Sequence, residues 1–290
     1  MEISIVINNY KTRGLLKQCL NGIFANPPSV DFEIIVVDNN SGDGSVELIR
    51  EKFAPDYPVR EIGAPAGEVE KVFSGFAGGN NQADGLFQGI KLIASEENLG
   101  HQRGNNLGIK HSSGKYILIL NTDIAIMDQG IDKLYQFMEQ QPQVALVGPR
   151  LKNPDGSIQF SCLRFPSAWV PIYRRTALGK LPFAKREIDK YLMTDFNHSE
   201  TRPVDWILGS CELVRRSAID QVGLMDEELF MYFGDVAWCK KFFQAGYSVY
   251  YFPETDIVHY HKRESAESGM FSKIFWIHIF DWIRYLKKYT

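Results

Sequence analysis

One stretch near the middle of the chain, GKYILILNTDIAIM from Gly114 to Met127, constrains the fold most strongly. Its residues Tyr116–Leu120 suit a buried strand, and Asn121, Thr122 and Asp123 follow directly. An acidic group is therefore expected at the carboxyl end of a central strand, where open α/β sheets bind their ligands. With no Lys or Arg within five residues, this carboxylate suits a divalent cation that holds a diphosphate. The alternative is a turn or helix N-cap aspartate.

The N-terminal segment predicts a β-α-β unit. Apolar strands are expected at Ile3–Ile7 and Phe32–Val37, and Thr12–Phe24 between them has apolar residues at helical spacing. Such a unit implies a parallel sheet with a right-handed crossover. The Gly-rich fingerprint of dinucleotide-binding folds is missing from it, so NAD and FAD are disfavoured.

Polar side chains follow both of these strands. Asn9 and Tyr10 come after the first strand, and Asp38 and Asn40 come after the second. Because neighbouring parallel strands end at the same edge of a sheet, we expect these groups to line one crevice. A crevice of this kind can hydrogen-bond a nucleotide base and its ribose.

The composition excludes several classes of protein. The 290 residues are 44% hydrophobic and 13% aromatic, which suits a large globular core. A net charge of −3 gives no broad basic field, so nucleic acid is not expected as a partner. No apolar run reaches the roughly 20 residues of a membrane span, and MEISIVINNY lacks a signal peptide's basic start, so a cytoplasmic location is expected. The four cysteines lack Cys-x-x-Cys spacing, which favours reduced and mostly buried thiols over zinc ligands or disulfides.

The middle of the chain divides into two parts. From Pro55 to about Ser95, the mixture of Pro, Gly, Ala and Glu predicts a long loop or insertion. Between Glu96 and Tyr116, glycines recur every four residues among Asn and His side chains. Small residues let a backbone approach phosphate closely, and Arg103 can supply charge. A helix is expected at Asn106–His111.

Four blocks resemble the inverting glycosyltransferases of family 2, which have the GT-A fold, and among them the rhamnosyltransferase-like enzymes of cell-surface polysaccharide synthesis. The blocks are VVDNNSGDGS (36–45), ENLGHQRGNNLGI (97–109), LILNTD (118–123) and GPRLKNPDGSIQ (148–159). The resemblance extends from residue 3 to about residue 262. GFAGGNN (75–81) looks like a second copy of the Asn/Gly block, but spacing to the central strand favours the copy at 97–109.

The resemblance implies a donor site and a metal site. Asp38 would bind the nucleotide base, and Asp123 would bind Mn²⁺ or Mg²⁺ with His259 as a second ligand. Asn121 stands where the family's metal-binding element has its first acidic residue. The residues expected to contact the nucleotide-sugar donor are Asn9, Tyr10, Asp38, Asn40, Arg103, Asn105, Asn106 and Asn121.

The resemblance also implies a catalytic base, Asp235, at the start of a helix in VGLMDEELFMYFGDVAWCKK. This residue would remove the proton from the acceptor hydroxyl, and a helix N-terminus would keep it ionised. An N-cap role for Asp235 is compatible with that function. The usual Glu-Asp-x-Asp motif is incomplete, because Gly234 replaces the Glu and Ala237 replaces the second Asp.

The C-terminal part carries features of an acceptor side. A basic and aromatic stretch at 166–201, which includes Arg174 and Arg175, is either an acceptor loop or a solvated surface. The apolar residues of Met270–Tyr289 predict a helix that packs on its own domain, forms a homodimer or lies at the inner face of the plasma membrane.

The whole chain is therefore predicted to be a metal-dependent inverting glycosyltransferase of GT-A fold, with a Rossmann-like, mostly parallel sheet flanked by helices and a C-terminal helical extension. We expect one GT-A domain at 1–265, with a nucleotide-sugar half to about residue 125 and an acceptor half at 126–265, and a C-terminal amphipathic helix at 266–290. Its donor would be dTDP-rhamnose or a UDP-sugar, and its acceptor a glycan or a lipid-linked sugar. A sugar nucleotidyltransferase and a weakly active nucleotide-sugar-binding module are the alternatives.

Overall fold

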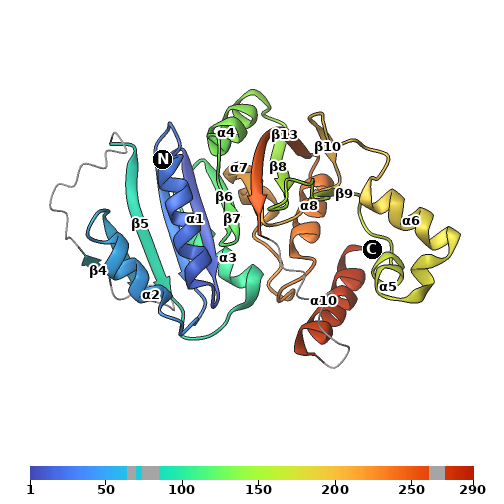
Figure 1. Cartoon of the computed structure of the whole chain (residues 1–290), viewed down its shortest axis with the longest axis horizontal. Coiled ribbons are helices and arrows are strands. Elements are labelled where there is room, and N and C mark those ends of the chain that lie inside the picture. The colour runs from blue at the N-terminus through green and yellow to red at the C-terminus, as the bar shows by residue number, and fades with distance from the viewer. Residues whose placement is uncertain (64–69, 74–84, 261–271) are drawn as a thin grey trace.

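A single mixed sheet runs along the length of the molecule (Figure 1). The computed structural model describes residues 1–63, 70–73, 85–260 and 272–290. Over these ranges the sheet has eleven strands in the order β10-β13-β8-β12-β6-β1-β2-β5-β3-β4, with β7 paired to β13, and β9 and β11 form a separate two-stranded sheet. The strands are β1 Ile3–Asn9, β2 Phe32–Asp38, β3 Val59–Gly63, β4 Glu70–Phe73, β5 Phe87–Ala94, β6 Tyr116–Asn121, β7 Ile124–Ala125, β8 Val144–Lys152, β9 Cys162–Leu163, β10 Arg202–Val204, β11 Trp206–Ile207, β12 Cys211–Arg215 and β13 Ser248–His259.

The central strands confirm the predicted parallel core. β6, β1, β2, β5 and β3 run parallel to one another, and β12 joins β6 and β4 joins β3 antiparallel at the two ends of this set. The register places Asn9 beside Asp38 and Asn8 beside Asn121. The polar strand ends therefore meet at one edge of the sheet, as the sequence predicts.

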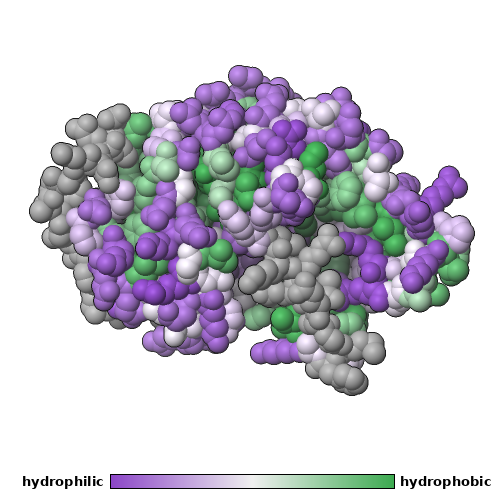
Figure 2. Space-filling view, in the orientation of Figure 1, coloured by the Kyte–Doolittle hydropathy of each residue, from purple (hydrophilic) through white to green (hydrophobic). Residues whose placement is uncertain are grey.

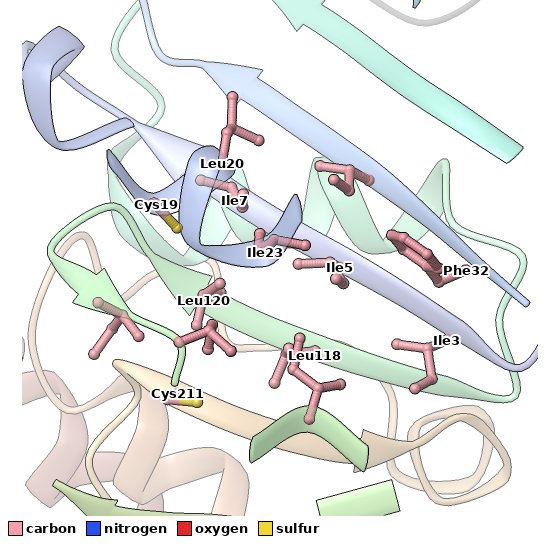
Figure 3. Close-up of a cluster of buried hydrophobic side chains, with 14 of the residues drawn as sticks. Ile3, Ile5, Ile7, Cys19, Leu20, Ile23, Phe32, Leu118, Leu120 and Cys211 are labelled. Carbon is pink, nitrogen blue, oxygen red and sulfur yellow. The ribbon is translucent and has the colours of Figure 1, made fainter. Parts of the chain in front are cut away.

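Helices cover both faces of this sheet. Figure 3 shows the isoleucines of β1 packed against Leu20 and Ile23 of the first helix, and α2 and α4 lie on the same face. α3, α7 and α8 cover the other face. Each fully buried aliphatic side chain contributes about 1.5–3 kcal/mol to this packing. The helices are α1 Arg13–Ala25, α2 Ser45–Leu48 continued by a π-helical turn Ile49–Phe53, α3 Gly100–Lys110, α4 Gly130–Gln140, α5 Val170–Arg175, a 3₁₀ turn Ala177–Lys180, α6 Pro182–Leu192, α7 Arg216–Val222, α8 Gly234–Gln244 and α10 Lys273–Tyr289.

The prediction of a long loop from Pro55 to Ser95 is wrong for much of that range. Three strands lie in it, and β5 is an interior strand between β2 and β3. Two residues of β5 interrupt its apolar pattern. Lys91 forms an ion pair with Glu33 at 2.8 Å, and Gly89 has φ +111°. A Cβ at Gly89 would lie 2.7 Å from the Pro58 carbonyl oxygen, so this strand needs a glycine. The possible second Asn/Gly block at 75–81 lies outside the described residues.

Other predicted boundaries agree with the structure more closely. α3 begins at Gly100 instead of Asn106, because the Asn/Gly block itself is helical. The C-terminal helix is present at Lys273–Tyr289, and all four cysteines are buried as predicted. No helix within the described ranges combines the length and apolar character that crossing a bilayer requires.

Candidate active site

A hydrogen-bonded network joins the carboxyl ends of β1 and β2. Asn9 Nδ2 donates to Asp38 Oδ1 at 2.7 Å and to Ser41 Oγ at 3.0 Å, and the Ser41 amide donates to Asp38 Oδ2 at 3.0 Å. Each Asp38 oxygen thus has a fixed donor, while the carboxylate keeps further acceptor positions. Asn40 Nδ2 donates to the Glu96 carbonyl at 2.8 Å and has a left-handed φ of 59°.

A hollow of about 330 Å³ opens beside this network. Asp38 and Asn40 line one side of it, and Ala94 and Ser95 at the end of β5 line another. Its size and polar rim suit a base and ribose. Tyr10 lies at the same end of the sheet and is 43% exposed, and a hydrogen bond with Asn98 is the main cause that lowers its pKa. A larger hollow of about 660 Å³, between the end of α1 and α4, contains none of the candidate residues.

Of the predicted donor residues on α3, two point elsewhere. The side chain of Asn106 is fully buried, where its Nδ2 donates to the Met225 carbonyl at 2.9 Å and its Oδ1 accepts from the Met225 amide at 3.0 Å. Arg103 lies 3.9 Å from Glu227 on the helix surface. The structure therefore does not bring Asn106 and Arg103 to the hollow, and Asn106 instead ties α3 to the segment before α8.

The remaining residues of this block surround His101. His101 Nε2 lies 3.3 Å from Asn121 Oδ1, and Asn105 Nδ2 lies 3.3 Å from His101 Nδ1. Burial lowers the pKa of His101, while its hydrogen bond with Asn121 and the charges of Asp235 and Asp123 act in the opposite direction. His101 is therefore within electrostatic range of both carboxylates that the sequence predicts for metal binding and for catalysis. His101 belongs to the ENLGHQRGNNLGI block, and that membership is the sequence signal that could have identified it as a candidate site residue.

The predicted metal ligands lie together. β13 pairs with β7, which brings His259 opposite Ile124, and His259 Nε2 is 3.3 Å from Asp123 Oδ2. Gln159 fixes the histidine ring: its Nε2 donates to Asn153 Oδ1 and to the His259 carbonyl, so its Oε1 faces His259 Nδ1 at 2.9 Å. A neutral His259 then carries its proton on Nδ1.

This arrangement tests whether a cation fits. The lone pair of His259 Nε2 faces a carboxylate oxygen of Asp123, and two acceptors that face each other are suited to share a positive ion. Across the described residues, no third His, Cys, Asp or Glu joins them. Asp123 and His259 would hold a cation such as Mn²⁺ or Mg²⁺ only together with oxygens of a bound ligand, and a carboxylate with an imidazole is a ligand pair that such a cation accepts.

Asp235 occupies the first turn of α8, as predicted. Its Oδ2 accepts from the Gly209 amide at 3.1 Å, and its Oδ1 accepts from the Val236 amide at 2.8 Å. Burial raises the pKa of Asp235, whereas these two hydrogen bonds and the nearby His101 lower it. A carboxylate with a raised pKa is a stronger base, and the two amides keep it oriented.

The loop that holds Asp235 is attached directly to the strand that leads to Asp123. The Asn121 amide donates to the Ser210 carbonyl at 2.9 Å, next to Gly209. A Cβ at Gly209 would lie 3.2 Å from the Asp235 Cβ, so a glycine permits this close approach. The predicted metal ligand Asp123 and the predicted base Asp235 are thus connected through one extension of the β6–β12 pairing.

The two departures from the Glu-Asp-x-Asp motif have structural counterparts. Any Cβ at Gly234 would overlap the side-chain amide of Gln102, which is buried and within hydrogen-bonding distance of the Leu229 and Phe230 carbonyls. Ala237 is fully buried on the sheet face that α8 covers, and the carboxyl of Glu212 on β12 is fully buried as well. Neither Glu212 oxygen has a hydrogen-bond partner among the described residues. Burial, and then the charge of Asp235, raise the pKa of Glu212 well above its ordinary value.

Comparison with solved structures identifies the fold. Staphylococcus aureus TarS (residues 1–349) matches 89% of this chain and 60% of its own, with a TM-score of 0.55 and 15% identity. The mannosyltransferase PcManGT from Pyrobaculum calidifontis, solved with GDP-Man and Mn²⁺, matches 99% of this chain and 70% of its own, with a TM-score of 0.54 and 16% identity. The chain has the GT-A fold of these glycosyltransferases.

Sequence comparison then identifies the family. The family model "Glycosyl transferase family 2" matches residues 4–67 and 80–223, and the chain belongs to this family. It is 32% identical over 193 residues to N-acetylglucosaminyl-diphospho-decaprenol L-rhamnosyltransferase of Mycobacterium tuberculosis, which covers 62% of this chain and 61% of that protein. It is 26% identical over 199 residues to the rhamnosyltransferase WbbL of Escherichia coli K12, which covers 65% and 70%. The chain thus spans about three fifths of the mycobacterial relative, and the predicted rhamnosyltransferase-like resemblance is confirmed.

Proposed function

We propose that this protein is an inverting glycosyltransferase that moves a sugar from a nucleoside-diphosphate sugar to a hydroxyl of a glycan or lipid-linked acceptor. One observation carries the proposal: a buried, backbone-oriented carboxylate, Asp235, and the Asp123–His259 pair are brought to the same end of the sheet by the pairing of Asn121 with Ser210. A base for the acceptor and a binding site for the leaving group at opposite ends of one site are what a single displacement requires. The family assignment favours this reading over a nucleotidyltransferase.

The donor would occupy the edge formed by β1, β2, β5 and β6. Asp38, held by Asn9 and Ser41, would accept from the base, and Asn40 would border the ribose at the hollow. dTDP-rhamnose is the donor class we favour, because relatives include a dTDP-rhamnosyl transferase of Shigella flexneri, with UDP-sugars as the second choice.

Asp123 and His259 would hold a divalent cation, as their facing acceptor atoms support. When bound, such a cation neutralises charge on the departing diphosphate. Gln159 keeps the His259 lone pair directed at this position, and Asn121 and His101 lie beside it. Two structural neighbours were solved with Mn²⁺, which agrees with this ligand set.

Asp235 would act on the acceptor. The acceptor oxygen forms a bond to the anomeric carbon as the bond from that carbon to the diphosphate oxygen breaks, and the hydroxyl proton passes to Asp235. Attack from the face opposite the leaving group inverts the anomeric configuration. The amides of Gly209 and Val236 hold the carboxylate oxygens so that their orientation does not depend on solvent.

Replacing Asp235 with Asn tests the proposal. We expect turnover to fall by about 10²-fold or more with donor affinity nearly unchanged, because a general base acts on the acceptor in the transition state. Transfer and donor hydrolysis should both be measured with sugar and lipid-linked acceptors, and donor affinity by calorimetry. If wild-type protein binds the donor but, like the Asn variant, shows neither transfer nor hydrolysis, the binding-module alternative would replace this proposal.

A further inference from the structure

The helices α5 and α6 and the 3₁₀ turn between them form a helical hairpin at one end of the molecule (Figure 1). We call residues 169–192 the α5–α6 hairpin. Val170 of α5 and Tyr191 of α6 are buried in the core on the sheet face that α3, α7 and α8 cover. The 3₁₀ turn has no buried residue. The hairpin therefore joins the core through few side chains and exposes most of the others.

Large apolar side chains are exposed on this hairpin. Trp169 and Phe183 are 58% and 61% exposed, and Leu178 and Leu181, between the two helices, are 48% and 41% exposed. The ring of Tyr173 contacts both aromatic residues, because it stacks on Trp169 at a centroid distance of 6.4 Å and meets Phe183 edge-on at 6.0 Å. The three rings thus form one continuous cluster. Apolar side chains that gather at the surface in this way mark an interaction site.

The same hairpin is basic. It contains six Lys or Arg and two acidic residues, although the whole chain has a net charge of −3. Figure 2 shows hydrophilic and hydrophobic side chains intermixed over α5 and α6. Four of the cations are exposed and form no ion pair with any described residue: Lys180, Lys185, Arg186 and Lys190. Such cations beside exposed aromatic rings favour a partner that is both anionic and apolar.

The outer side of α6 combines the two kinds of residue. Phe183, Arg186 and Lys190 are three and four residues apart, which places them on one side of the helix. Ala184 and Tyr191 are the buried residues of α6. Long basic side chains can lay their stems along an apolar layer while their charged ends reach phosphate groups. This pattern is typical of a helix that lies at the surface of a lipid bilayer.

The shape of the surface also favours a bilayer over an inserted peptide or small molecule. Neither of the two hollows described above is lined by a residue of the α5–α6 hairpin. Small ligands and peptides are bound in pockets or grooves that select their shape. An anionic bilayer instead supplies phosphate groups over an apolar layer, which complements exposed cations beside exposed rings.

We propose that the α5–α6 hairpin docks the protein on an anionic lipid bilayer, with Trp169 and Phe183 in the apolar layer and the basic side chains on lipid phosphates. This inference goes beyond the proposed transfer reaction, because it concerns where the protein is held and assigns no substrate. Burial raises the pKa of Tyr191 to about 12, and the charge of Asp235 adds to that rise. The buried side of the hairpin is therefore within electrostatic range of the proposed base, and docking would bring the acceptor side close to the bilayer.

Flotation with lipid vesicles tests this docking. Vesicles of phosphatidylcholine and phosphatidylglycerol in equal parts are compared with vesicles of phosphatidylcholine alone. We expect wild-type protein to bind the anionic vesicles and to be released by high salt, which screens the attraction. Lys185→Gln with Arg186→Gln should weaken that binding about tenfold or more, because two surface cations are lost. Phe183→Ser should also weaken it, because it removes an apolar side chain that enters the bilayer.

Two control variants remove similar side chains outside the hairpin. Lys17→Gln with Lys52→Gln removes the same charge from exposed positions on α1 and on the π-helical turn after α2. Met127→Ser removes an apolar side chain that is 51% exposed. Both controls should bind the anionic vesicles like wild-type protein. Unfolding midpoints in urea check that all four variants are folded.

Three outcomes would overturn the proposal. The first is equal vesicle binding by the hairpin variants and their controls, and the second is failure of wild-type protein to bind the anionic vesicles. The third concerns a second copy of the chain as the occupant of this surface. A wild-type dimer in sedimentation velocity that both hairpin variants convert to a monomer would assign the surface to dimerisation.

Discussion

At the scale of single residues, Glu212 is the most unusual group in the molecule. It is a carboxyl with no exposed surface, no hydrogen-bond partner among the described residues, and Asp235 as its nearest charged influence. A buried carboxylate without donors would be very costly, so burial favours the protonated form of Glu212 in the folded protein. The negative charge of the pair then resides on Asp235, which has two amide donors.

Glu212 should make stability depend on pH. Its pKa is raised on folding, so its contribution to stability is complete below the unfolded pKa near 4.5 and is lost as pH rises through the folded pKa. We expect the free energy of unfolding to fall with pH above 5, by up to about 1.4 kcal/mol per pH unit from this group. Glu212→Gln should flatten that slope in urea titrations from pH 5 to 8.

The control for this experiment is Glu51→Gln, which changes an exposed glutamate. Asp235 also has a raised pKa and contributes a slope of the same sign, whereas buried His101 has a lowered pKa and loses stability as pH falls. The comparison between Glu212→Gln and wild type cancels both of these effects. Slopes that are indistinguishable in the two proteins would show that Glu212 is ionised in the folded state.

At the scale of elements, α10 is attached to the segment before α8 by the buried Asp281, in addition to contacts of Lys288 and Tyr289 with Asp226 near its end. Asp281 satisfies three consecutive amides of the Phe230–Tyr232 segment, and Trp276, Phe280 and Ile283 on the helix remain 40–53% exposed. The helix therefore packs on its own domain, one of the three alternatives that the sequence leaves open. The outer face of α10 takes no part in that packing, because its apolar residues Trp276, Phe280 and Ile283 stay exposed.

Asp281→Ala should release this attachment. Three buried amides would lose their acceptor, which costs about 3 kcal/mol or more. We expect a lower unfolding free energy and faster protease cleavage near α10, with Asp220→Ala on the exposed surface of α7 as control. Cleavage rates and unfolding midpoints equal to those of the control would contradict the role of Asp281.

The elements also show what the sequence can and cannot predict. The β1-α1-β2 unit and β6 follow from local periodicity, whereas the position of Asp235 at a helix start follows from the family resemblance, and the structure contains all of them. β5 does not follow, because Gly89 and Lys91 interrupt its apolar pattern and are explained only by Pro58 and Glu33 on other segments. The same limit applies to Glu212 and Gln102, whose neighbours are distant in sequence. His101 belongs to the block at 97–109, but its contact with Asn121 forms only when α3 packs on β1 and β2.

At the scale of the whole molecule, the proposed donor and cation should stabilise the fold together. A ligand that binds only the folded state adds about 2.7 kcal/mol at a concentration 100 times its Kd. Mn²⁺ should increase the thermal stabilisation produced by dTDP or UDP, and Asp123→Ala should remove that increment without unfolding the protein. The exposed carboxylate Asp128 offers a control, Asp128→Ala. If Mn²⁺ adds the same thermal stabilisation to the nucleotide complex of the Asp123 variant as to that of the wild type, Asp123 is not a metal ligand.

The hydrogen bond from the Asn121 amide to the Ser210 carbonyl has a consequence for selectivity. It fastens the segment that ends in Asp123 to the loop that orients Asp235, and a sheet pairing stretches little. Under the proposed function, the distance between the leaving group at Asp123 and the base Asp235 would therefore be fixed. Acceptors would be selected by which of their hydroxyls can reach Asp235 and the anomeric carbon at the same time. The linkage position in the product would then be set by this backbone spacing instead of by side chains that contact the sugar.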